Sequence, residues 1–243
     1  MNTEQESCGL FGKIPQQSDF VNLHLPESFI EHWHHWAQSC VSISREQLGD
    51  DWLDRYITSP IWHFAIMPGV AHEKSIVGIM IPSVDEVGRY FPFTIAHTGE
   101  HDVWGAYLNG DPWFEQAEKL ALLPLAEDIT YSRIVGDLEN LGVPELDALP
   151  QYETHAANHA FKGNQIIEQQ DQDKHQLTES LVSNAYKKLY GNHSLWWTKG
   201  SNLIEPCLAI SAGLPDPGQF AAMLDGQWQQ WGWSQEQVQT ETS

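Results

Sequence analysis

The segment Pro82–Pro92 gathers three side chains that could do chemistry, Ser83, Asp85 and Arg89. The chain has only 12 Lys and Arg against 33 Asp and Glu, so an Arg placed four residues after an Asp in a short turn is unusual. In one interpretation Asp85 accepts hydrogen bonds from backbone N–H groups, Gly88 supplies a positive φ, and Arg89 braces the turn. In the other, the turn holds the guanidinium of Arg89 outward to bind a carboxylate of a partner. Such turn residues are common, which favours the brace, but the sequence leaves both roles open.

The 12 His residues raise the question of a metal site. Two groups have spacings of interest: His32, His34 and His35, and His155 with His159. No Asp or Cys stands at a spacing that completes a site around the first group. In the second group, Ala156 occupies the place of the Glu in the His-Glu-x-x-His pattern. We therefore expect no metal ion, and no other cofactor is indicated.

No pattern for nucleophilic catalysis or phosphate binding is complete. The chain has no Gly-x-Ser-x-Gly elbow, and its three cysteines lie far apart in the sequence. Gly9–Lys13 resembles a glycine-rich phosphate loop only superficially, because Leu10 and Phe11 begin an apolar strand. We therefore expect a protein that is not an enzyme and assign no catalytic residue; the alternative is a metal-dependent hydrolase that uses His and Asp.

The charge of the chain limits its partners. The formal net charge of −21 repels phosphate backbones and anionic lipid head groups. The acidic segment Met1–Cys8 lacks the features of a secretory signal, and no apolar run approaches the ~20 residues that span a bilayer. We therefore expect a cytoplasmic protein that binds no nucleic acid and does not insert into a membrane.

Short apolar runs bounded by Gly or Pro alternate with segments whose apolar residues recur every three or four positions. The expected strands are Leu10–Pro15, Ile61–Met67, Ser75–Ile81, Phe91–Ala96, Ser194–Thr198 and Pro206–Ser211. The expected helices are one from Pro26 to about Cys40, Ser44–Tyr56 with Ser44 and Gln47 as a capping box, Asp111–Leu123, Glu127–Leu141, Leu177–Leu189 and Phe220–Asp225. This alternation predicts an α/β fold, a single domain with a central mixed β-sheet flanked by helices on both faces.

Several blocks of the sequence also follow a characteristic order. They are Gly9–Pro15 with Asp19–Val21, Leu25–Pro26, Trp33-x-x-Trp36, Leu48–Gly49 with Trp52 and Tyr56, Ser59–Ala65, Pro82–Pro92, Ser194–Trp197 and Pro217-x-x-x-Phe220. In this order the blocks resemble the TagF (ImpM-like) family of proteins associated with bacterial type VI secretion systems. Gln17-Ser18 stands where that family commonly has Arg-Gly before the Asp, so a basic residue is missing here.

The resemblance implies a non-catalytic cytoplasmic protein that acts as a post-translational repressor of type VI secretion. It implies binding to a component of the system, such as a forkhead-associated-domain scaffold protein. One family domain would occupy residues 9–226, between an N-terminal tail at 1–8 and an acidic, polar C-terminal tail at 227–243, with a polar loop at about 163–176. The alternative within the same machinery is a structural or assembly subunit of the apparatus.

Within this interpretation the turn and the first loop supply the surface for the partner. The candidate partner-binding residues are Asp19, Asp85, Arg89 and Tyr90. Trp62, Trp196 and Trp197 are expected in the core or lining a pocket, because each indole buries a large apolar area.

Overall fold

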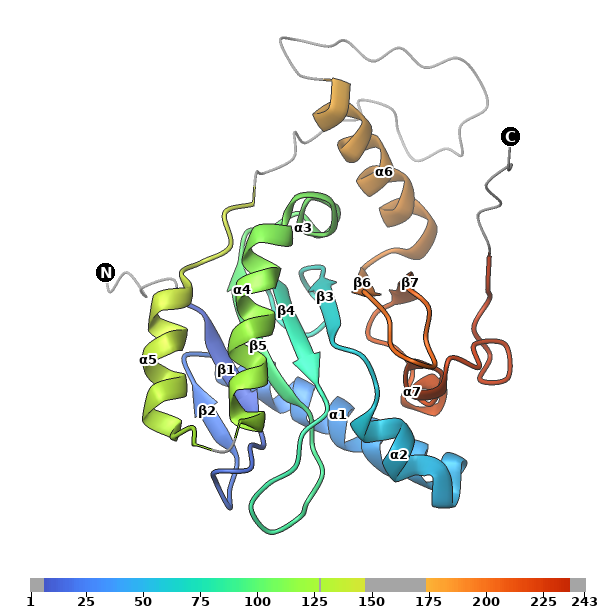
Figure 1. The fold of residues 1–243 in the computed structure, drawn as a ribbon. Coiled ribbons are helices and arrows are strands. Elements are labelled where there is room, and N and C mark those ends of the chain that lie inside the picture. Colours follow the sequence, from blue (N-terminus) through green and yellow to red (C-terminus); the bar gives the residue numbers. More distant parts are fainter. Residues whose placement is uncertain (1–6, 127, 147–173, 237–243) are drawn as a thin grey trace, which may run out of the picture.

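The computed structural model of the protein describes residues 7–126, 128–146 and 174–236. Within these residues one seven-stranded sheet has the order β2-β1-β5-β4-β3-β6-β7, and all neighbouring strands are antiparallel (Figure 1). The strands are β1 (Gly9–Gly12), β2 (Val21–Leu23), β3 (Trp62–Ile66), β4 (Ser75–Ile81), β5 (Phe93–Gly99), β6 (His193–Thr198) and β7 (Cys207–Ala212). The expected α/β class is confirmed. The sheet is antiparallel rather than mixed, because short connections join β3 to β4, β4 to β5 and β6 to β7.

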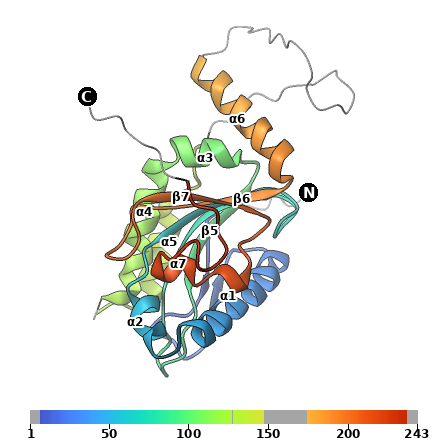
Figure 2. The same ribbon diagram turned by 90° about the vertical axis from the view of Figure 1, so that its right-hand side faces the viewer.

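Helices cover both faces of the sheet (Figure 2). One face carries α1 (Glu27–Leu48), the 3₁₀ turn η1 (Gly49–Asp51), α2 (Trp52–Ile57), η3 (Pro217–Gln219) and α7 (Ala222–Asp225). The other carries α3 (Val103–Asn109), α4 (Asp111–Leu122), η2 (Leu123–Leu125) and α5 (Tyr131–Leu141). The helix α6 (Lys174–Tyr190) lies beside α3 at one end of the sheet (Figure 1).

Two hydrophobic layers result, because alternate residues of each central strand point to opposite faces. In β4, Val77 and Ile79 belong to the layer under α3, α4 and α5, whereas Ile76 and Met80 belong to the layer under α1 and α2. Trp33 of α1 fills the centre of this second layer and donates its indole N–H to the Thr94 hydroxyl at 3.0 Å. The strands β3 and β4 are therefore buried along their whole length.

The prediction that a second helix begins at Ser44 is wrong. The first helix continues to Leu48, the chain turns at Gly49 with a φ of 55°, and α2 begins at Trp52. Ser44 therefore lies inside α1, where its hydroxyl accepts a hydrogen bond from the Trp52 indole at 3.0 Å instead of capping a helix. This contact folds α2 back onto α1.

One strand and one α-helix of the described residues lie outside the sequence expectations. The short strand β2 pairs with β1, and α3 begins after Asp102, whose carboxylate accepts from the backbone N–H groups of Trp104 and Gly105. The fifth helix begins at Tyr131 rather than at residue 127, because Thr130 accepts the N-terminal hydrogen bond from Arg133 N.

The packed part of the chain extends beyond residue 226, as far as Trp233. The Trp231 indole donates to the carboxylate of Asp225 at 2.9 Å, and the Trp233 indole donates to the carbonyl of Gln219 at 3.0 Å. The Trp228 ring lies edge-on to Trp62, with 6.2 Å between their centroids. At the other end, the thiol of the buried Cys8 donates to the Gly142 carbonyl at 2.9 Å.

The polar segment at about 163–176 lies almost entirely outside the described residues, apart from the first turn of α6. His155 and His159 lie outside them as well. Among the helices that the structure describes, none is long and apolar enough to cross a bilayer.

Candidate functional site

Asp85 organises the turn between β4 and β5. Its Oδ1 accepts from the backbone N–H of Val87 at 3.1 Å and of Arg89 at 2.8 Å, so the carboxylate closes the turn around Gly88. Gly88 has a φ of 86°, which a residue with a side chain adopts at a cost. The turn is therefore built by the side chain and the glycine that the sequence singles out, as the bracing interpretation predicts.

The second oxygen of Asp85 binds two cations. Lys13 Nζ lies 2.5 Å and Arg89 Nε 2.7 Å from Oδ2. The Asp85 side chain is fully buried, and the side chain of Lys13 is only 6% exposed. Burial raises the pKa of the Asp85 carboxyl, but the hydrogen bonds from Lys13 and Arg89 outweigh it and hold the pKa well below its usual range. We call Lys13, Asp85 and Arg89 the clasp, because the three join the end of β1 to the turn.

Arg89 both braces the turn and remains accessible. Its terminal NH₂ donates to the carbonyl of Ser18, and its side chain is 57% exposed. The backbone N–H of Glu86 also donates to the carbonyl of Gln17, at 3.2 Å. The turn and the loop between β1 and β2 are therefore fixed to each other. The guanidinium of Arg89 is exposed, as the second interpretation predicts, but it is also hydrogen-bonded within the protein.

Asp19 and Tyr90 lie next to the clasp but outside it. Asp19 is exposed, and its carboxylate accepts from the backbone N–H of Phe20 at 3.2 Å. Tyr90 is half-buried, with its ring edge-on to Trp52 at 5.3 Å and to Tyr56 at 5.8 Å. Of the four candidate contacts, Asp85 is thus inaccessible, Tyr90 packs on α2, and Asp19 and Arg89 reach the surface.

The three candidate Trp residues occupy different places. Trp196 lies in the layer under α1 and donates to the Ser194 hydroxyl at 2.8 Å, whereas Trp197 lies on the opposite face of β6. Trp62 is 1% exposed and donates its indole N–H to the Met223 carbonyl at 3.1 Å. All three are buried, and Trp62 also lines a shallow apolar recess.

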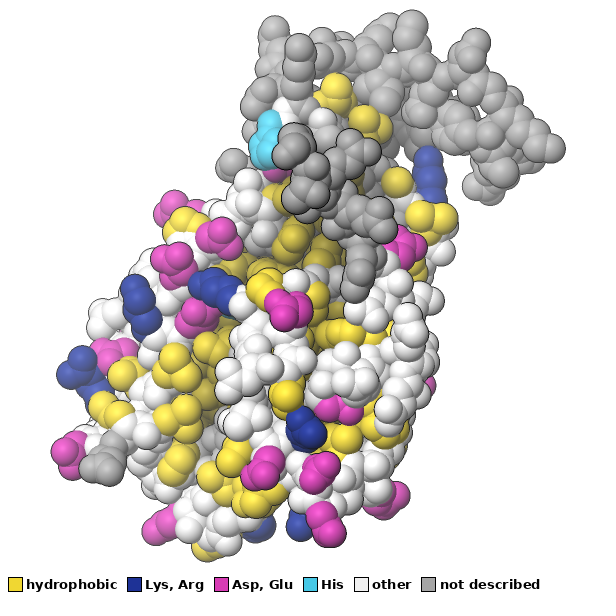
Figure 3. All heavy atoms as spheres, turned by 45° about the vertical axis from the view of Figure 1, so that its right-hand side comes forward, with side chains coloured by type: hydrophobic (Ala, Val, Ile, Leu, Met, Phe, Trp, Pro, Cys, Tyr) yellow, Lys and Arg dark blue, Asp and Glu magenta, His cyan; other side chains and the backbone are white. Residues whose placement is uncertain are grey.

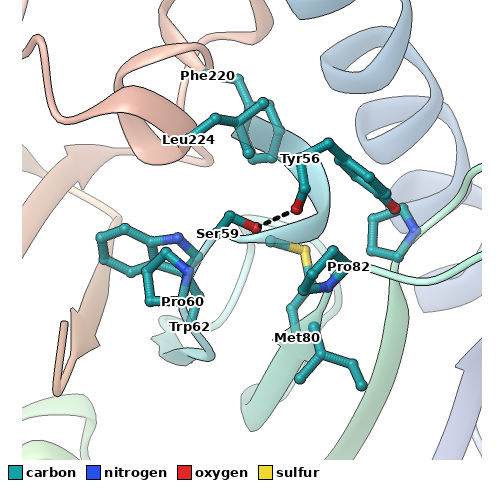
Figure 4. Close-up of a pocket in the computed structure, with 10 residues that line it drawn as sticks. Tyr56, Ser59, Pro60, Trp62, Met80, Pro82, Phe220 and Leu224 are labelled. Atoms are coloured by element: carbon teal, nitrogen blue, oxygen red, sulfur yellow. Dashed lines mark hydrogen bonds between the residues drawn. The ribbon is translucent and has the colours of Figure 1, made fainter. Parts of the chain in front are cut away.

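The recess lies where the end of α2, β3, the start of the turn and α7 meet (Figure 4). Trp62 and Pro60 form one wall, Met80 and Pro82 form another, and Phe220 and Leu224 close the side toward α7. Its volume of about 10 Å³ holds no more than about one water molecule. The hydroxyl of Ser59 donates to the Tyr56 carbonyl at 2.8 Å. The recess therefore offers an apolar depression and no reactive group.

A buried polar contact that the sequence patterns missed joins β3 to α4. His63 Nε2 lies 2.6 Å from an oxygen of Glu118, and Lys199 Nζ lies 3.0 Å from the same oxygen. Burial lowers the pKa of His63, against the opposing effect of Glu118. The ring is 1% exposed and lies between Trp197 and Phe114, with centroids at 5.5 and 5.2 Å. This histidine is thus enclosed by aromatic rings rather than open to a substrate.

The histidines of α1 have partners of their own. His32 Nδ1 donates to the Ser28 carbonyl at 2.7 Å, and the His34 ring packs edge-on against Phe20 at 5.1 Å. Within residues 7–126, 128–146 and 174–236, no three His, Cys, Asp or Glu side chains are grouped closely enough to hold a metal ion.

Lys13 is the residue of the clasp that the sequence patterns did not single out. The feature of the sequence that could have indicated it is a single Lys directly after the apolar strand Gly9–Gly12.

The fold is that of an α/β protein, and its most extensively hydrogen-bonded candidate feature is the turn between β4 and β5, which lies beside an apolar recess. Over residues 9–141 the chain matches the family model described as the TagF N-terminal domain, Type VI secretion system-associated. The chain therefore belongs to this family and is a type VI secretion system-associated protein. A similar solved structure is that of PA0076 from Pseudomonas aeruginosa PAO1, with 30% sequence identity and a TM-score of 0.79. The similarity covers 98% of this chain and 99% of that one. None of the curated proteins compared matches the sequence.

Proposed function

We propose that this protein is a cytoplasmic, non-catalytic repressor of type VI secretion that acts by binding a component of the apparatus. The forkhead-associated-domain scaffold protein of the same system is the partner that we propose. Membership of the family supports the connection with the secretion system. The observation that supports binding over catalysis is the clasp, because its two cations and its carboxylate are occupied in joining β1 to the turn.

If the clasp acted in acid–base catalysis, one of its charged groups would have to exchange a proton with a substrate. The Asp85 carboxyl is fully buried, and Lys13 is bound to it at 2.5 Å. The clasp instead gives the loop and the turn one fixed conformation, which reduces the entropy lost when a partner binds. A rigid surface of this kind suits a protein that acts by occupying a component.

The experiment that tests this proposal is deletion of the gene, followed by quantification of secreted effectors in the culture medium. We expect secretion to rise and to return to its original level when the wild-type gene is restored. Unchanged secretion after deletion would contradict the repressor role, and reduced secretion would indicate an assembly subunit. The alternative of a metal-dependent hydrolase is checked by measuring the metal content of the purified protein. One bound metal ion per molecule would favour that alternative.

A further inference from the structure

The surface formed by η1, α2, α7 and the segment up to Trp231 has features that the clasp does not explain; we call it the α2–α7 face. Leu53 is 40% exposed and Ile57 is 55% exposed, and because they lie four residues apart in α2 they share one side of this helix, with the exposed Asp54 next to Leu53. The recess begins at Tyr56 of the same helix and Ser59. The exposed apolar side chains and the apolar recess therefore both involve α2 and the residues that directly follow it.

A polar groove of about 460 Å³ borders the same helix on another side, since Asp51 and Arg55, which line it, lie two positions before Leu53 and Ile57, respectively. One of its walls comes from Gln47, Asp51 and Arg55, and the other comes from the loop at 202–203, Asp225 and the segment 227–231. This volume lies within the ~300–1,000 Å³ typical of ligand pockets. This volume leaves room for a long side chain of a bound protein.

Asp225 gives this groove a specific chemistry. The residue is more than nine-tenths buried, and its carboxylate accepts from two neutral donors, the backbone N–H of Gln227 at 2.8 Å and the Trp231 indole at 2.9 Å. Within the described part of the chain, no Lys or Arg nitrogen lies within 4.0 Å of this carboxylate. Buried carboxylates are normally paired with a cation, so Asp225 is suited to one that arrives with a ligand.

The charge around the groove points to the same ligand. The segment Asp50–Ile57 carries three carboxylates and one Arg, which lies 4.0 Å from Asp51. The chain from Gly200 to Ser243 contains no Lys or Arg at all. Acidic side chains are interspersed with apolar ones on the surface shown in Figure 3. Such a face attracts basic segments and repels acidic ones.

We propose that the α2–α7 face contributes to binding the protein partner, and that the partner supplies a segment with both apolar and basic side chains. An apolar side chain of the partner packs on Leu53 and Ile57. A Lys or Arg enters the groove, where Asp51 and Asp225 neutralise it. This inference rests on the proposed function only in that the ligand is a protein. It adds a contact on α2 and α7, next to the loop and the turn that the clasp fixes, since Tyr90 of the turn packs on Trp52 and Tyr56 of α2.

The test is photo-cross-linking in the native bacterium, with p-benzoylphenylalanine in place of Ile57. The matched control carries the same residue in place of Leu125, which is also 55% exposed but belongs to η2, next to α4 and α5 on the opposite face of the sheet. We expect an adduct from position 57 that is at least tenfold more abundant than from position 125. Mass spectrometry of the cross-linked peptide should show Lys or Arg near the attached residue. An adduct no more abundant than the control's, an adduct to a second copy of this chain, or a segment without Lys and Arg would overturn the proposal.

The charge contribution is measured with the captured partner once it is purified. We expect Asp51→Lys to weaken its binding at least tenfold, and Glu115→Lys, the same charge change on the exposed side of α4, to leave it within twofold. Equal effects of the two variants would overturn the role of the groove. Melting temperatures of all variants are compared with that of the wild type, to show that each is folded. Secretion after gene deletion is scored separately, so failure of the repressor role is distinguished from failure of this surface.

Discussion

Replacing Asp85 with Asn tests the clasp, because it removes the charge and keeps an oxygen that can accept from the turn. The Lys13 side chain is 6% exposed, so its ammonium would lose its partner while it remains buried. Removing one member of a buried ion pair costs about 3–5 kcal/mol. Arg89 is 57% exposed and can be hydrated, so it adds little to this cost. We therefore expect Asp85→Asn to lower the free energy of unfolding by about 3–4 kcal/mol.

Urea denaturation followed by Trp fluorescence measures this change, and the melting temperature should fall by roughly 6–16 °C for a protein of this size. The control is Asp137→Asn on α5, which breaks a pair with Arg133 of the same 2.7 Å length as the Arg89 pair. Both side chains of this control pair are partly exposed, at 67% and 31%, so we expect a loss below about 1 kcal/mol.

The pair of Lys13 and Asp85 can also be removed together. In Lys13→Met with Asp85→Asn no buried charge remains at the end of β1, so the double variant should be less destabilised than the sum of the single variants by about 2 kcal/mol or more. Additive effects, or a loss for Asp85→Asn no larger than that of the control, would refute the reasoning.

Three further predictions follow from the described contacts. Burial, and then the charge of Lys74, lowers the pKa of His97 from 6.5 to about 4, so the unfolded chain binds this proton more tightly. The neutral His97 therefore stabilises the folded state fully above pH 6.5, and this contribution is lost as the pH falls toward 4. We expect urea titrations to show that the free energy of unfolding of the wild type falls by about 2–3 kcal/mol over this range, and that of His97→Gln falls by less. Arg89→Ala should cost only about 1 kcal/mol in the same assay while accelerating amide hydrogen exchange in the loop before β2, because this residue fastens the loop to the turn. Trp228→Ala should cost about 2 kcal/mol, since this ring packs against Trp62; a loss under about 0.5 kcal/mol would contradict the packing of the C-terminal segment.

The sequence predicts β3 and β4 closely because both strands are mostly apolar runs, interrupted by His63 in β3 and Gly78 in β4, and lie between turn residues. The stripe through Phe29, Trp33 and Trp36 likewise predicts the buried face of α1. These features depend on neighbours along the chain. The sequence does not predict where α1 ends, because the Ser44 hydroxyl is used by an indole eight residues away instead of by a backbone N–H.

The clasp could be predicted only in part. Asp85, Gly88 and Arg89 belong to one turn, so their spacing indicates that Asp85 and Arg89 lie close together. Lys13 lies 72 residues before Asp85, and only the pairing of β1 with β5 brings the two together. The groove beside α2 depends on the folding of residues 227–233 onto α7, which the expected tail at 227–243 does not include.

The central claim, repression by occupation of a partner, predicts a dependence on stoichiometry. In the deletion strain, the gene is expressed from a titratable promoter, and the number of molecules per cell of this protein and of the scaffold protein is counted by quantitative mass spectrometry. We predict that effector secretion declines in proportion to the number of molecules of this protein and reaches its minimum near equivalence with the scaffold. Full repression at a few per cent of that number would indicate catalysis, and no repression at any level would contradict the account.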